Sequence, residues 1–165
     1  MIRQTKQIVI GTLAALTTVV ASISSAQAVT YVSLFSDARI FSGTNWIWWN
    51  PNIVNAFIPA GGRLVKVTFS AESACYGASG WCTARVVYRQ VGSATINEFQ
   101  PAVGEDFAFD SSDSNNEGSG SWESHAISRS AFLPAGNYQI WVQARTTSNA
   151  LTLRLDDAHL RVEYE

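Results

Sequence analysis

Apolar and polar residues alternate with a period of two along several segments, and this pattern restricts the fold more than any other feature of the chain. In segment 64–73, Val65, Val67 and Phe69 share one parity, and polar residues occupy the other. Segment 138–146 repeats the pattern. Because successive side chains of a β-strand point to opposite faces, each segment is predicted to be a strand with one buried face.

The C-terminal segment contains two apolar sets of opposite parity. A slip of one residue turns a whole strand face from the core to solvent, so a bulge or tight turn at Asp156 and Asp157 must absorb the change. The first set comprises Leu151, Leu153 and Leu155, and the second comprises Leu160, Val162 and Tyr164.

Further strands are predicted between clusters of Gly, Pro, Asn and Ser, whereas helical periodicity is hard to find after residue 28. Many short strands without a substantial helix indicate an all-β fold, either an antiparallel β-sandwich or a barrel. These strands are expected at residues 46–49, 53–58, 82–90, 94–99, 106–110 and 121–130.

An internal similarity favours the jelly-roll form of the sandwich. Segment 57–67 aligns without gaps on segment 132–142, and in both a Pro-Ala-Gly turn leads into an alternating strand. Proline presets the bend, and glycine permits a positive φ. Equivalent units in the two halves are expected of a double Greek-key jelly roll. The alternative is coincidence, because such turns are common in β proteins.

The N-terminal residues have the order of a secretory signal peptide. Arg3 and Lys6 precede an apolar stretch from residue 8 to about 21, and Ala26 and Ala28 occupy the positions of a small-residue cleavage site. The alternative is a membrane anchor, but threonines interrupt the stretch, which is shorter than the roughly 20 apolar residues of a spanning helix. We therefore expect residues 1–28 to be cleaved.

The remaining residues, 29–165, are expected to form a single secreted or periplasmic β-sandwich domain, since 165 less 28 leaves 137 residues, enough for one core. Loss of Arg3 and Lys6 leaves nine cationic against 13 acidic residues, a formal net charge of −4. Nucleic acid and anionic lipid require clustered positive charge, so neither is an expected partner. No later segment is apolar and long enough to span a bilayer, so no stable membrane insertion is expected after processing.

Cys75 and Cys82 are the only cysteines, and six residues separate them. In an oxidising compartment an even pair at this spacing predicts one disulfide. A redox motif or a zinc site would require a different spacing or more ligands. We expect the disulfide to join the end of the strand 64–74 to the start of the strand 82–90.

Six tryptophans are many for a chain of 165 residues. An indole face exposed at a strand end suits the C–H face of a sugar ring, with neighbouring amides for the hydroxyls; the alternative is that indoles plug the ends of a small sandwich. In stretch 46–49, alternation prevents one core face from absorbing every side chain, so at least one indole there should be exposed. The predicted ligand-binding residues are Trp46, Trp48, Trp49, Trp81, Asn45 and Asn50.

The stretch 111–121 contains no apolar residue and is predicted to be a long exposed loop. Asp113, Asn115 and Glu117 place oxygen ligands at alternate positions before a glycine, as the first half of a calcium loop does. Ser124 stands where such a loop has its bidentate carboxylate. A solvated loop without a cofactor is therefore the expectation, and calcium is the alternative.

Catalytic patterns are weak in this chain. His125 and His159 are the only histidines, and neither lies in a recognised nucleophile motif. Adjacent carboxylates such as Asp156 and Asp157 do not supply the separation across a cleft that glycoside hydrolysis needs. No catalytic residue is therefore predicted, and the chain is not expected to be an enzyme.

Two parts of the chain carry a resemblance to known proteins. The first is the tail, Leu133-Pro-Ala-Gly-Asn-Tyr-Gln-Ile-Trp-Val followed by Leu153-Arg-Leu-Asp-Asp-Ala-His-Leu-Arg-Val-Glu, and the second is Phe107-Ala-Phe-Asp with Ser121-Trp-Glu-Ser-His. Together they resemble a group of secreted bacterial β-sandwich proteins of unassigned activity. The tail alone is similar to the closing strands of jelly-roll carbohydrate-binding modules. This resemblance implies a way of ending a jelly roll and transfers no ligand residue.

The function expected from the tryptophans, the acidity and the fold type is that of a secreted, non-catalytic binding module for a surface glycan. The alternative is a structural, self-assembling extracellular jelly-roll protein, which would be a homo-oligomer. A small secreted hydrolase ranks third, because it requires a cleft that joins a histidine to a nucleophile.

The mature chain is predicted to start at Val29, because Ala26 and Ala28 satisfy the small-residue requirement of the cleavage site. The intact mass of secreted material measures this directly. Protein that retains residues 1–28 in a membrane fraction would show that the segment is an anchor.

Overall fold

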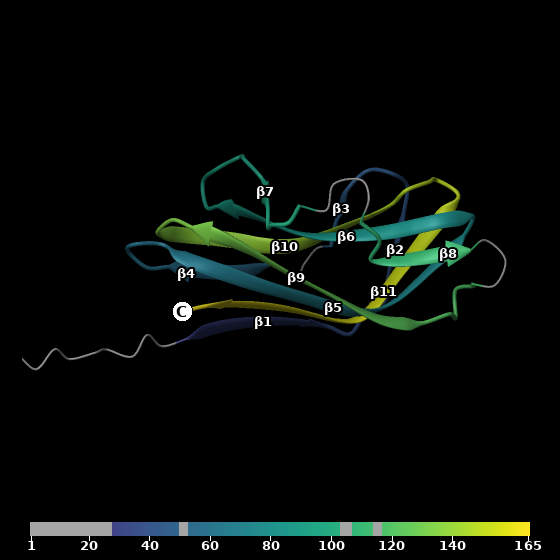
Figure 1. Cartoon of the computed structure of the whole chain (residues 1–165), viewed down its shortest axis with the longest axis horizontal. Coiled ribbons are helices and arrows are strands. Elements are labelled where there is room, and N and C mark those ends of the chain that lie inside the picture. Colours follow the sequence, from purple (N-terminus) through teal and green to yellow (C-terminus); the bar gives the residue numbers. More distant parts are fainter. Residues whose placement is uncertain (1–27, 50–52, 103–106, 114–116) are drawn as a thin grey trace, which may run out of the picture.

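The computed structural model describes residues 28–49, 53–102, 107–113 and 117–165. These residues form two antiparallel sheets stacked face to face, as Figure 1 shows, so the predicted all-β sandwich of jelly-roll type is confirmed. Within these ranges no helix is long and apolar enough to cross a membrane. The predicted signal peptide lies outside the described residues, apart from Ala28.

The first sheet, sheet A, is built around its two longest strands. It consists of β1 (Val29–Phe35), β2 (Arg39–Ser42), β5 (Arg63–Gly77), β9 (Glu123–Leu133) and β11 (Leu151–Tyr164). Strands β1 and β2 follow one another along one edge of β11, whereas β5 pairs along its other edge and carries β9 beyond it.

The second sheet, sheet B, repeats this plan. It consists of β3 (Ile47–Trp48), β4 (Val54–Ile58), β6 (Ser79–Gln90), β7 (Asn97–Glu98), β8 (Asp110–Asp113) and β10 (Gly136–Thr146). Strands β3 and β4 share one edge of β10, and β6 occupies the other edge. The far edge of β6 carries β7 and β8.

The inner faces of the two sheets enclose one apolar core. Val65, Val67 and Phe69 of β5 are fully buried, as their shared parity predicts. Ile140 and Val142 of β10 belong to the same core from the other sheet. The period-two alternation therefore identifies the buried face of both central strands.

The change of parity in β11 occurs where the sequence predicts it. The register between β11 and β5 shifts between Asp156 and His159. Asp157 adopts a φ of 42°, in the left-handed region that few residues other than glycine enter. This bulge allows Leu155 and Leu160, which have opposite parity, to be buried in the same core.

The two Pro-Ala-Gly turns occupy equivalent places in the sandwich. The first carries the chain from β4 in sheet B to β5 in sheet A, and the second carries it from β9 in sheet A to β10 in sheet B. The pairing is reciprocal, because Ile58 lies opposite Gly136 and Leu133 lies opposite Arg63. Each incoming strand thus pairs with the outgoing strand of the other copy, which gives the internal similarity a structural meaning.

Three features differ from the sequence-based expectations. Strands β1 and β2 were not predicted, because exposed apolar residues such as Leu34 obscure the alternation there. The strand predicted at 106–110 begins only at Asp110, and Phe109 is not in a strand. The loop predicted at 111–121 is wrong at its start, since β8 pairs with β6 and buries Ser112. Backbone pairing, and not apolar side chains, forms this polar strand.

The predicted Cys75–Cys82 disulfide is present, with a Cα–Cα distance of 5.9 Å. Cys75 lies in β5 and Cys82 in β6, so the bond joins sheet A to sheet B across the corner where the chain changes sheets. The corner itself requires Gly77, whose φ is +115°, because a Cβ there would collide with the carbonyl oxygen of Ala150.

Replacing both cysteines, Cys75→Ala with Cys82→Ala, should lower the free energy of unfolding by about 2.5 kcal/mol, the chain-entropy value for a loop of about eight residues. Urea denaturation measures the change. Dithiothreitol should destabilise the unaltered protein to a similar extent and leave the double variant unaffected. Equal stability of the unaltered protein with and without reductant would contradict a stabilising role for the bond.

Candidate functional site

The outer face of sheet B is the candidate site. A strand face that points away from the core normally carries polar side chains, whereas this face carries several indoles among its charged groups. On β10, Ile140 and Val142 enter the core, so Trp141 and Gln143 between and beside them point away from it. The register places Trp141 opposite Val87 and Gln143 opposite Arg85. The residues of this outer face are Trp46, Trp48, Trp81, Arg85, Arg89, Glu98, Gln139, Trp141, Gln143 and Arg145.

Two guanidinium groups hold Trp46 against this face. The guanidinium carbon of Arg85 lies 4.1 Å from the centroid of the Trp46 ring, and that of Arg145 lies 4.5 Å from it. Both distances are within the range of cation–π attraction. Trp46 is half-buried as a result, so its indole is fixed in place by residues of β6 and β10.

Trp48 of β3 contacts a second indole of this face, that of Trp141. The rings of Trp48 and Trp141 lie 5.2 Å apart at an interplanar angle of 39°. Trp141 is only 1% exposed, although it is outside the core. The Nε1–H donors of both indoles are buried and have no acceptor among the described residues. An unpaired buried donor costs roughly 1–3 kcal/mol.

The polar side chains between the indoles form two hydrogen-bonded groups. Nε of Arg85 donates to Oε1 of Gln143 at 2.9 Å, and its Nη1 donates to Oε2 of Glu98 at 3.0 Å. Nε of Arg89 donates to Oε1 of Gln139 at 2.8 Å. A guanidinium has five donors, so these bonds fix each arginine while using part of its capacity.

Burial lowers the pKa of the Arg85 guanidinium from its ordinary value, and the attraction and hydrogen bond of Glu98 oppose that shift. The coulombic effect of Arg145 lowers the same pKa further. An arginine side chain nevertheless stays protonated in proteins. The face therefore presents fixed positive charge in a chain whose net charge is negative.

Trp81 is the exposed member of the set, at 39% of its surface. It shares the outward parity of Arg85 on β6 and lies opposite Ser111 of β8. Thr147 fixes its backbone, since the Oγ1 hydroxyl of Thr147 donates to the carbonyl oxygen of Trp81 at 2.8 Å. The indole thus projects from a rigid backbone position.

The alternation argument for residues 46–49 is correct in its parity and wrong in one assignment. Trp46 and Trp48 point away from the core, because successive side chains of a strand point to opposite faces. Trp49 faces the other way, is 3% exposed and stacks on Phe35 with centroids 5.2 Å apart, so it is a core residue and not a ligand contact. Trp46 and Trp48 are both half-buried, because arginines cover Trp46 and Trp141 covers Trp48.

Some of the other predicted site residues are described by the structure, and others are not. Asn45 is exposed beside Trp46, whereas Asn50 lies outside the described residues. Asn115 of the calcium prediction is also outside them. The backbone N–H of Asp113 donates to Oε2 of Glu117 at 3.0 Å, so that carboxylate contacts its own loop. The calcium alternative remains a prediction.

The arginines and glutamines of this face were not predicted from the sequence. Gln139, Gln143 and Arg145 have the outward parity of the segment 138–146, which is a signal available in the sequence. Their partners Arg85 and Arg89 become visible only through the pairing of β6 with β10. Registers between strands so distant in the chain are not encoded in a local pattern.

One histidine lies beside a serine, as a hydrolase would require. The Oγ atom of Ser73 is 2.8 Å from Nδ1 of His125. Ser73 is 0% exposed and has the parity of the core residues Phe69 and Ala71 on β5, so its hydroxyl faces the core and not a substrate. The contact therefore orients the imidazole and does not form a nucleophile site.

Comparisons with known proteins do not identify the function of this site. No protein-family model and no curated protein matches the chain. Among solved structures, a carbohydrate-binding module from Cellvibrio mixtus lichenase 5A, in complex with cellotriose, is 15% identical with a TM-score of 0.38, over 83% of this chain and 88% of that one. A structure of infectious bursal disease virus, Gx strain, is 7% identical with a TM-score of 0.29, over 84% of this chain and 38% of that one. At these TM-scores neither likeness carries an argument about fold or ligand.

Trp49→Ala should cost about 3–5 kcal/mol of unfolding free energy, because it empties a core site between the two sheets. Trp81→Ala should change stability by no more than about 0.5 kcal/mol, because the residue lies outside the core and is exposed. Chemical denaturation of the two variants side by side measures the difference. Similar losses in both would contradict the opposite placement of these two indoles.

Proposed function

We propose that this protein is a secreted, non-catalytic module that binds a glycan through the outer face of sheet B. The observation that carries the proposal is the set of indoles Trp46, Trp48 and Trp81, interleaved on one sheet face with hydrogen-bonded arginines. A strand face that only needed solvation would not require aromatic groups at these positions. The Cys75–Cys82 disulfide supports a location of the protein in an oxidising compartment outside the cytosol.

The chemistry of the face suits a sugar chain. Indole faces accept the C–H faces of sugar rings, and Trp81 offers the most accessible one. The planar guanidiniums of Arg85 and Arg89, already fixed by glutamine side chains, can donate to hydroxyl or carboxylate oxygens. Because such donors are fixed before the ligand arrives, less side-chain entropy is lost on binding.

The positive charge favours glycans that contain carboxylates over neutral ones. Three arginines lie on the face, and Arg85 pairs there with the carboxylate of Glu98. Arginine matches a carboxylate in a bidentate geometry, which a neutral hydroxyl does not reproduce. We therefore expect uronic-acid glycans to bind more tightly than neutral glycans of equal length.

A glycan array containing neutral and acidic oligosaccharides tests the proposal, with binding then quantified by calorimetry. Trp81→Ala should weaken binding at least tenfold and leave the thermal midpoint nearly unchanged. Trp122→Ala is the matched control. The guanidinium carbon of Arg154 lies 4.6 Å from the Trp122 ring, so this indole also contacts an arginine, but Arg154 belongs to β11 of sheet A. Equal loss in both variants, or no binding to any glycan, would reject this face as the site.

A second candidate function is self-assembly through sheet A. Val32, Leu34 and Ile40 are 53%, 75% and 63% exposed, and all three lie on the strands at one edge of the sheet. Exposed apolar groups at a sheet edge are typical of association surfaces. Light scattering separates the two candidates: a monomer that binds glycan supports the first, and a stable oligomer without glycan binding supports the second.

A further inference from the structure

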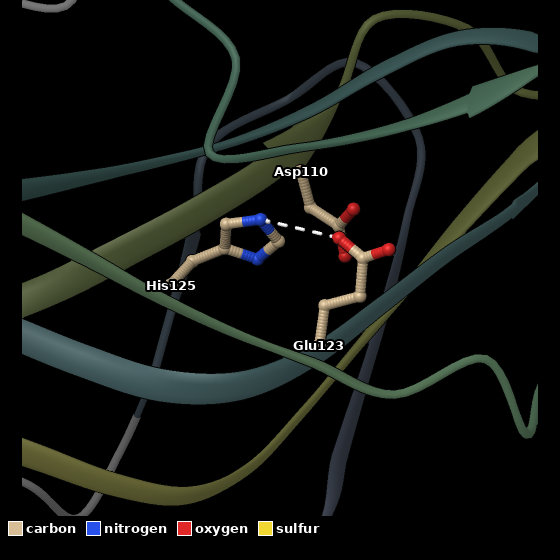
Figure 2. Close-up of side chains that lie close together, drawn as sticks. All are labelled: Asp110, Glu123 and His125. Atoms are coloured by element: carbon tan, nitrogen blue, oxygen red, sulfur yellow. Dashed lines mark ion pairs between the residues drawn. The ribbon is translucent and has the colours of Figure 1, made fainter.

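A group of three metal-ligating side chains lies at the open edge of the sandwich, away from the outer face of sheet B. Figure 2 shows Asp110, Glu123 and His125 directed toward one another. Asp110 belongs to β8 of sheet B, whereas Glu123 and His125 belong to β9 of sheet A. The group therefore spans the two sheets.

The distance between the His125 imidazole and the Glu123 carboxylate matches the spacing of two ligands on a small divalent ion. One ligand atom from each residue lies within 4.8 Å of the others, and Nε2 of His125 is 3.4 Å from Oε2 of Glu123. A tetrahedral zinc ion with bonds of about 2.1 Å separates its ligand atoms by about 3.4 Å. The imidazole and carboxylate set favours zinc and similar ions over calcium, which takes six to eight oxygen ligands.

The second observation is a buried carboxylate without a partner. Asp110 is only 7% exposed, and its Oδ2 atom has no hydrogen-bond partner among the described residues. The other oxygen, Oδ1, accepts from the adjacent backbone N–H of Ser111. Buried charges in proteins are normally paired or coordinate a metal. The unpaired Oδ2 therefore favours a cation bound beside it.

Ser73 fixes the orientation of the His125 ring, as a partner of a metal-binding histidine does. Its Oγ lies 2.8 Å from Nδ1 of His125, on the side of the ring opposite to Nε2. When Nε2 binds a metal, Nδ1 carries the proton and donates it to a neighbouring oxygen, which fixes the ring. Ser73 is fully buried and cannot move to solvent, so Nε2 is directed toward the two carboxylates.

We propose that Asp110, Glu123 and His125 form a binding site for a divalent transition ion of the zinc type. Three protein ligands leave a fourth position to water, which reaches the site because the Glu123 side chain is 65% exposed. The bound ion joins β8 to β9 and closes the edge between the sheets. The alternative is a plain histidine–glutamate ion pair, which binds no metal and leaves Asp110 unpaired.

Calorimetric titration with zinc chloride, on metal-free protein without a histidine tag, tests the site. The expected result is one zinc ion per chain and a thermal midpoint about 10 °C higher at a hundredfold excess over the dissociation constant. Asp110→Asn and His125→Gln should each abolish this binding. His159→Gln is the matched control, because His159 is the other histidine and lies outside the group, and it should retain the full stoichiometry.

Cobalt(II) provides a second measurement that does not depend on stability. Bound in place of zinc, it should give the intense visible absorption of a tetrahedral centre in the unaltered protein and in His159→Gln. Ser73→Ala should keep one site per chain and weaken it by about 10–100-fold, as loss of an orienting partner does.

Three results would overturn the proposal. These are absence of zinc binding by the unaltered protein, zinc binding that survives Asp110→Asn, and cobalt spectra without a tetrahedral signature. The glycan proposal is judged separately, because Trp81→Ala should leave zinc binding intact.

Discussion

The antiparallel pairing of β6 with β10 is the interaction on which the rest of the structure depends. It runs without interruption from Tyr138 opposite Gln90 to Thr146 opposite Cys82. This register buries Val142 on one side and brings Arg85 to Gln143 on the other. A slip of one residue would place arginines in the core, so the same register that stabilises the fold also assembles the outer face.

The corner between β5 and β6 is the second constraint, because it joins the two sheets covalently. Cys82 also lies opposite Asp110 in the ladder of β6 and β8, and Ser73 lies opposite Glu123 in the ladder of β5 and β9. The disulfide and the metal-ligating group are therefore neighbours at the same end of the sandwich. Backbone pairing with β6 holds the short polar strand β8 at this end, and the proposed metal ion would join β8 to β9 as well.

Local patterns in the sequence predicted those parts of the fold that local physics decides. The parity of β5 and β10, the bulge at Asp157 and the disulfide all follow from residues close together in the chain. The opposite orientation of Trp48 and Trp49 followed from alternation, but burial of Trp49 depends on aromatic residues of other strands. The arginine network and the metal-ligating group depend on registers between distant strands, which no local pattern encodes.

The most direct test of the glycan account is the nuclear magnetic resonance signal of each indole N–H during titration with the tightest ligand from the array. The account predicts saturable shifts for Trp46, Trp48 and Trp81, and no shift for the core residue Trp49. Assignment by single Trp→Phe variants makes each signal unambiguous. Shifts confined to Trp122, or no shift at Trp46, Trp48 and Trp81 while the glycan binds, would contradict it.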